Sequence, residues 1–125
     1  MVLKKSVQLL ISEANKEITS VTADEAIEKV NKGAVLLDVR EPNETKSGIA
    51  KNAICIPRGM LEFIVDPESP LYDARIREDS EIIVYCASGG RGALAVKTLT
   101  HMGYLNVTNL LGGYASWKES GGDVS

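Results

Sequence analysis

Short apolar runs alternate with amphipathic segments along most of this chain. Four of these runs fit buried strands, at residues 34–37, 53–56, 81–85 and 107–111. A continuous apolar run is typical of a strand that is covered on both faces, as in a parallel sheet. Because the runs alternate with helical patterns, the chain is predicted to form an α/β layer structure.

Apolar residues at helical spacing predict an amphipathic helix over residues 3–17. A capping box from Thr22 to Glu25 predicts a second helix, which Gly33 ends. Three further helices are expected, over 59–65, from Arg91 to Gly103 and around Trp117. We interpret residues 1–18 as an N-terminal helical extension and residues 19–125 as a single domain. The pattern leaves open whether the first helix packs on that domain.

The stretch 82–94 reads as a buried strand, a glycine-rich turn and the start of a helix. Cys86 stands at the end of the strand, and Arg91 follows five residues later. Glycines in the turn permit positive backbone angles, so successive N–H groups can point into one concavity at the helix N-terminus. A thiol in such a cradle is pushed toward the reactive thiolate. We therefore predict that Cys86 is a nucleophile in an anion-binding loop; the alternative is a small, inert, buried side chain.

Composition narrows the class of protein. The chain has 125 residues, a net charge of -3 and 44% apolar residues, which indicates one globular domain and gives no reason to expect a nucleic-acid partner. Two cysteines without Cys-x-x-Cys spacing suit neither a disulfide scaffold nor a metal site. Neither a signal peptide nor an apolar run of membrane-spanning length is found, so we expect a soluble cytoplasmic protein without a membrane partner.

Other side chains are candidates for the neighbourhood of the loop. Arg91 either pairs with an anionic substrate or braces loop carboxylates. Asp38 and Arg40 end a strand in the same layer as Cys86, and they either reach the loop or pair with each other. Lys51 and Arg58 flank the strand at 53–56, where they form a cationic rim or are plain surface charges.

Three further residues have interpretations that mostly involve no chemical role. Ser88 either donates its hydroxyl into the loop or is a turn residue. Cys55 lies within an apolar strand and is expected to be a buried thiol without a chemical role. His101 is the chain's single histidine and is expected at the surface, so a Cys–His catalytic pair is not predicted.

Three motifs occur in an order that resembles a single-domain rhodanese, a sulfurtransferase, over residues 19–122. The first runs from Leu36 to Glu44 and continues to Pro57, the second from Val84 to Arg91, and the third from Leu111 to Trp117. The first departs from the family pattern, because Gly48-Ile49-Ala50 stands where Gly-His-Ile is usual. Ala87 also lacks the polar or cationic side chain that many relatives carry, which weakens the case for thiosulfate as the best donor.

The resemblance implies a doubly wound α/β fold around a five-stranded parallel sheet with helices on both faces. It also implies a ping-pong reaction, in which Cys86 takes the outer sulfur of a small anionic donor such as thiosulfate. The resulting persulfide passes that sulfur to cyanide, a thiol or a protein acceptor. No metal or organic cofactor is implied.

The same resemblance assigns roles around Cys86. The donor is bound by the loop residues Ala87, Ser88, Gly89, Gly90 and Arg91, together with Lys51. From their place at the end of a strand in the same layer, and not from the resemblance, Asp38 and Arg40 are expected to support the loop. The loop has six residues, whereas phosphatases and arsenate reductases of this fold use seven. Those enzymes remain an alternative, as does a non-catalytic sulfur-relay or interaction module.

Overall fold

A single parallel sheet organises the molecule. Within residues 2–125, which the computed structural model describes, five strands lie in the order β1-β5-β4-β2-β3 and every pairing is parallel. The strands are β1 (Ser20–Val21), β2 (Val35–Asp38), β3 (Ile54–Cys55), β4 (Ile82–Tyr85) and β5 (Val107–Leu110). The doubly wound, five-stranded fold is thereby confirmed, and the strand that ends at Cys86 is the central one.

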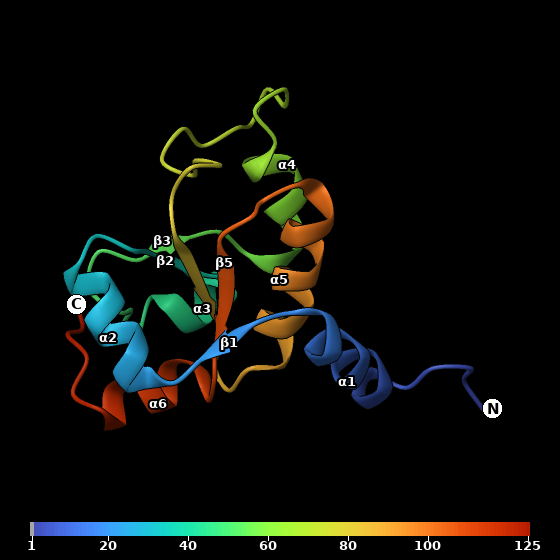
Figure 1. Cartoon of the computed structure of the whole chain (residues 1–125), viewed down its shortest axis with the longest axis horizontal. Coiled ribbons are helices and arrows are strands. Elements are labelled where there is room, and N and C mark those ends of the chain that lie inside the picture. The colour runs from blue at the N-terminus through green and yellow to red at the C-terminus, as the bar shows by residue number, and fades with distance from the viewer. Residues whose placement is uncertain (1) are drawn as a thin grey trace.

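Helices cover both faces of the sheet. They are α1 (Val7–Glu17), α2 (Ala23–Asn31), α3 (Pro42–Thr45), the 3-10 turn η1 (Arg58–Met60), α4 (Leu61–Val65), α5 (Gly90–Met102) and α6 (Gly113–Glu119). Figure 1 shows α2 and α6 on one side of the sheet, and α5 with α1 and α4 on the other. None of the helices described is both long and apolar enough to cross a bilayer.

The central strand feeds two separate cores. Ile82, Val84 and Cys86 belong to the cluster on the α5 side, whereas Ile83 and Tyr85 belong to the cluster that includes Trp117 of α6. This alternation follows from the two-residue period of a strand. Since both faces are covered, every residue of β4 is apolar or aromatic, which is why its pattern was readable.

Two elements and the exposure of one cysteine differ from the expectations. Strand β1 has only two residues, Ser20 and Val21, too few to give an apolar pattern. Helix α3 is one turn that begins at Pro42, and it is not among the helices expected from the sequence. Cys55 is exposed rather than buried, because its neighbours Ile54 and Ile56 point into the core and Cys55 points the opposite way.

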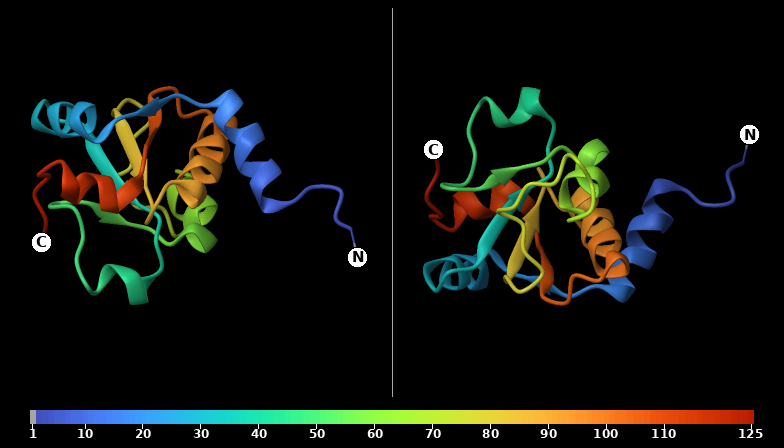
Figure 2. Two further views of the ribbon diagram at one scale, coloured as in Figure 1. Left: turned by 90° about the horizontal axis from the view of Figure 1, so that it is seen from below. Right: turned by 90° about the horizontal axis from the view of Figure 1, so that it is seen from above.

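Helix α1 packs against α5, which answers the question that its pattern left open. It begins at Val7 and not near residue 3. The Ser6 hydroxyl accepts the Leu9 N–H and caps the helix at this point. Ala14 is fully buried, and Glu17 pairs with Lys97 of α5 at 3.1 Å. Both views in Figure 2 show α1 lying beside α5. The division of the chain at residue 18 stays a prediction.

Candidate active site

Cys86 follows β4 directly, at the edge where the parallel strands end. Its side chain is 1% exposed, and its Sγ accepts a hydrogen bond from the Gly89 N–H at 3.0 Å. Gly89 has a φ of 128°, which a residue with a Cβ rarely adopts, and α5 begins at the next residue. Among the residues described, one amide therefore donates to the sulfur, where the sequence suggested a whole run of them.

The buried sulfur has a polar contact. The Gly89 N–H points at the thiol beside the N-terminus of α5, so the site is not a purely apolar pocket.

The Gly112-Gly113 pair closes the back of the loop. Gly113 has a φ of 58°, and a Cβ built on it would lie 2.4 Å from the Cys86 carbonyl oxygen. The next residue, Tyr114, donates its N–H to that same oxygen at 2.8 Å. The third sequence motif is thus a contact surface for the active-site loop, a role that the sequence did not reveal.

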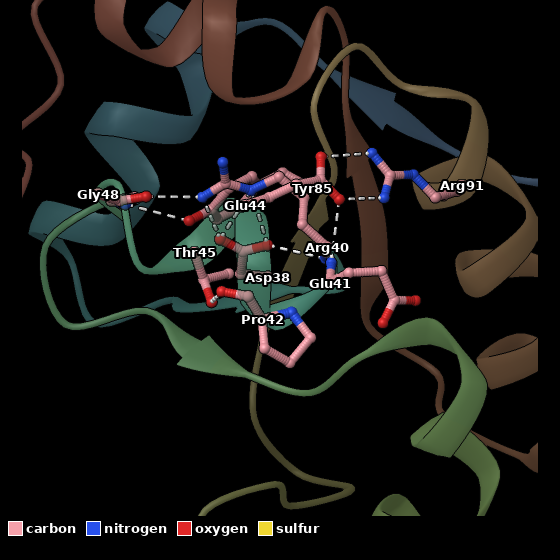
Figure 3. A network of polar contacts seen from close by, with 10 residues as sticks. Asp38, Arg40, Glu41, Pro42, Glu44, Thr45, Gly48, Tyr85 and Arg91 are labelled. Atoms are coloured by element: carbon pink, nitrogen blue, oxygen red, sulfur yellow. Dashed lines mark hydrogen bonds and ion pairs between the residues drawn. The ribbon is translucent and has the colours of Figure 1, made fainter.

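Arg91 braces the loop instead of projecting freely into it. Its two terminal nitrogens donate to the Glu44 carboxylate at 2.6 and 3.0 Å, as Figure 3 shows. This guanidinium, helped by the Glu41 N–H, lowers the pKa of Glu44 to about 2. Glu44 in turn raises the pKa of Arg91. Sequence reasoning missed Glu44, which lies 47 positions earlier on the single-turn helix α3.

Asp38 and Arg40 pair with each other, one of the two roles expected of them. Arg40 donates to Asp38 at 2.8 Å and to the Gly48 carbonyl at 2.8 Å, and both side chains are buried (Figure 3). The Arg40 guanidinium also lies over the Tyr114 ring, 4.3 Å from its centre. The pair therefore contacts the ring of Tyr114, whose N–H donates to the Cys86 carbonyl, and its support of the loop stays a prediction.

Tyr85 completes this buried group. Its hydroxyl accepts the Ala50 N–H at 3.0 Å, and its ring stacks on that of Tyr114 with centres 5.9 Å apart. Burial, together with the Asp38 carboxylate, raises the pKa of Tyr85 well above its ordinary value. The hydroxyl is thus a neutral anchor for the chain that leads into β3.

The other two candidate cations lie at opposite ends of β3. Lys51 precedes β3, so it stands at the opposite end of the parallel sheet, where it lines a hollow of about 560 Å³ beside α2 and α6. Arg58 bonds to Glu62 and to the Thr98 hydroxyl. The expected cationic rim is therefore not formed by these two side chains.

Two further expectations can be placed. Ser88 is exposed at the tip of the loop. His101 is exposed at the end of α5, where its Nε2 lies 3.3 Å from Glu17, so its surface position is confirmed. Among the described residues, no group of three or more acidic, histidine or cysteine side chains is arranged to hold a metal ion.

Comparison with known proteins places this geometry in a family. The family model described as "Rhodanese-like domain" matches residues 22–120. Thiosulfate sulfurtransferase 16 of Arabidopsis thaliana is 32% identical over 115 residues, covering 89% of this chain and 96% of its own length. The thiosulfate:glutathione sulfurtransferase of Saccharomyces cerevisiae is 35% identical, covering 76% and 72%.

Solved structures agree with the sequence comparisons. A protein of unknown function from Rhodopseudomonas palustris, described as a possible tyrosine phosphatase, superposes with a TM-score of 0.93 at 34% identity, covering 100% of this chain and 98% of that one. A human single-domain sulfurtransferase superposes with a TM-score of 0.72 at 28% identity, covering 80% and 95%. Some relatives are designated mitochondrial or chloroplastic, so a cytoplasmic location stays a prediction. The match across residues 22–120, with the fold and these relatives, shows that the chain belongs to the rhodanese family.

Proposed function

We propose that the protein is a sulfurtransferase that carries sulfur on Cys86. The observation that supports this most directly is the Gly89 N–H aimed at Sγ in a glycine-bent loop at the start of α5. The same donor can stabilise the thiolate and the terminal sulfur of a persulfide. The names of the relatives support the reaction class.

In the first half-reaction, the Cys86 thiolate attacks the outer sulfur of the donor. With thiosulfate, a new S–S bond forms at Sγ, and the bond to the sulfonate sulfur breaks with its electron pair, so that sulfite leaves. In the second half-reaction, cyanide or a thiolate attacks the outer sulfur of the persulfide. Thiocyanate or a new persulfide leaves, and the Cys86 thiolate is regenerated.

Intact mass spectrometry after incubation with thiosulfate or another sulfane donor tests this proposal. We expect the wild-type protein to gain the mass of one sulfur atom, and we expect Cys86→Ser to gain none. Cys55→Ser is the matched control, since Cys55 is the exposed second thiol and its loss should leave loading intact. If no donor adds sulfur to the wild type, the proposed function is wrong.

One solved relative makes phosphate-ester hydrolysis the second candidate, because it is described as a possible tyrosine phosphatase. The six-residue loop from Cys86 to Arg91 argues against it, since a shorter loop forms a tighter cup. The engagement of Arg91 by Glu44 also leaves that guanidinium less available for a phosphate. Turnover of an aryl phosphate faster than sulfur loading would reverse this order.

A further inference from the structure

Asn109 lies beneath the active-site loop and belongs to none of the three sequence motifs. It is on β5, opposite Val84 of the central strand, and is 2% exposed. Its Nδ2 donates to the Gly89 carbonyl at 3.3 Å. Gly89 is therefore held on both sides, since its N–H donates to Cys86 Sγ and its carbonyl accepts from Asn109 as well as from the Ala93 N–H of α5 at 2.9 Å.

The other end of the same side chain has no partner. Asn109 Oδ1 is buried without a hydrogen bond, and it lies where a Cβ on Gly92 would come within 2.3 Å of it. A buried carbonyl oxygen without a donor costs stability, so an apolar side chain of similar size suits this position better for folding alone. The amide orientation follows from chemistry, because the reverse would set an oxygen against the Gly89 carbonyl oxygen.

We propose that Asn109 is a positioning residue for the sulfur-carrying loop, an inference that rests on the proposed function. Its amide fixes the Gly89 residue in its positive-φ conformation and so keeps the Gly89 N–H directed at Sγ. The orphaned oxygen gives no benefit to folding, so the contact of Nδ2 with Gly89 accounts for the amide at this position. Asn109 touches neither the sulfur nor a substrate and acts through Gly89.

The test compares two neighbouring residues of β5 that carry unpartnered polar atoms. Asn109→Leu removes the amide that holds Gly89. Thr108→Val is the matched control, because Thr108 Oγ1 is also buried without a partner. Thr108 lies opposite Ile83, which belongs to the core that includes Trp117 and not to the core on the Cys86 side. Both variants are made in a Cys55→Ser background, so that alkylation reports Cys86 alone.

The readouts are the pH midpoint of alkylation by iodoacetamide, the rate of sulfur loading at pH 7 and the melting temperature. For Asn109→Leu we expect the midpoint to rise by about one unit and loading to slow roughly tenfold, since the thiolate fraction falls. Its melting temperature should equal or exceed that of the background. For Thr108→Val we expect an unchanged midpoint and loading rate.

The pH midpoint of alkylation reports a change in the loop only if the charges near Cys86 are the same in all variants. The charged groups around Cys86 are Arg91 of α5, which acts on Cys86, with Glu44 and Glu41 beside it. Asp38 and Arg40, from β2 and the residues after it, form a closed pair on the other face of the sheet. None of these groups is altered by either substitution.

Every outcome decides whether Asn109 positions the loop or is purely structural. If Asn109→Leu leaves the pH midpoint of alkylation and the loading rate unchanged, the inference is overturned. It is also overturned if neither Asn109→Leu nor Asn109→Ser folds, because a purely structural amide predicts that loss. Alkylation needs no sulfur donor, so the midpoint is readable even if the wild type takes up no sulfur. The failure of the proposed function is thereby distinguished from the failure of this inference.

Discussion

Glu44→Gln isolates the ionic brace between α3 and the active-site loop. Glutamine keeps the shape of the side chain and can still accept the Glu41 N–H, which bonds to Glu44 Oε1 at 3.1 Å. The substitution removes the negative charge that faces Arg91. The protein is expected to fold but to be less stable.

The magnitude follows from the carboxyl's pKa, which falls from 4.5 to about 2 on folding. At about 1.4 kcal/mol per unit, the whole shift corresponds to roughly 3 kcal/mol. Glu44 and Arg91 are 29% and 37% exposed, so water screens the pair, and part of the shift comes from the Glu41 amide that glutamine retains. We therefore expect a loss of about 1–2 kcal/mol at pH 7, or roughly 4–8 °C in melting temperature.

The pH dependence gives the stricter assay. Because folding lowers the pKa of this carboxyl, its contribution is complete above the unfolded value of 4.5 and is lost as the pH falls toward about 2. Urea denaturation from pH 7 to pH 2.5 should show the difference between wild type and Glu44→Gln shrinking through that window. Glu62→Gln, which removes the exposed partner of Arg58, is the control and should cost less than about 0.5 kcal/mol. A Glu44→Gln protein as stable as wild type at pH 7, or a difference as large at pH 2.5 as at pH 7, would refute the ionic contribution of the Glu44–Arg91 pair.

Two further substitutions test the other supports. Asp38→Asn leaves the 6%-exposed Arg40 guanidinium without its counter-charge, so we expect a loss of about 3–5 kcal/mol in urea denaturation, and a loss below 1 kcal/mol would contradict a buried ion pair. Gly113→Ala places a Cβ 2.4 Å from the Cys86 carbonyl oxygen and should abolish sulfur loading in the mass assay. Gly121→Ala, also at positive φ but with open space around it, should cost about 1–2 kcal/mol and keep loading, so equal effects of the two would be evidence against loop closure by Gly113.

Local patterns predicted the fold where a residue's neighbours in sequence decide its environment. The three longer strands, β2, β4 and β5, contribute apolar residues to both cores, and the Thr22–Glu25 capping box marks the start of α2 at Ala23. The helix at 3–17 was overextended, because only the Ser6 cap and not the apolar spacing marks its true start. β1 forms through its pairing with β5, and this long-range contact is not visible in the sequence of two residues.

Within the site, the sequence indicated the loop but not the side chains that hold it. Cys86, the glycines and Arg91 are contiguous, so their chemistry is visible in one stretch. Glu44 and Gly113 reach the loop only through the fold, one from α3 and the other from the turn into α6. Lys51 was placed with the loop from the family resemblance, yet the parallel direction of β3 puts it at the other end of the sheet. Strand direction is therefore the information that decides which of the candidate residues lie near the loop.

The exposed Cys55 has a practical consequence for anyone who handles this protein in air. Its thiol is exposed on the edge strand β3, whereas Cys86 is 1% exposed. Storage without reductant should therefore yield covalent dimers through Cys55 that run at twice the monomer mass on a non-reducing gel. Such dimers say nothing about natural assembly, and a serine at position 55 gives a cleaner starting material for biochemistry.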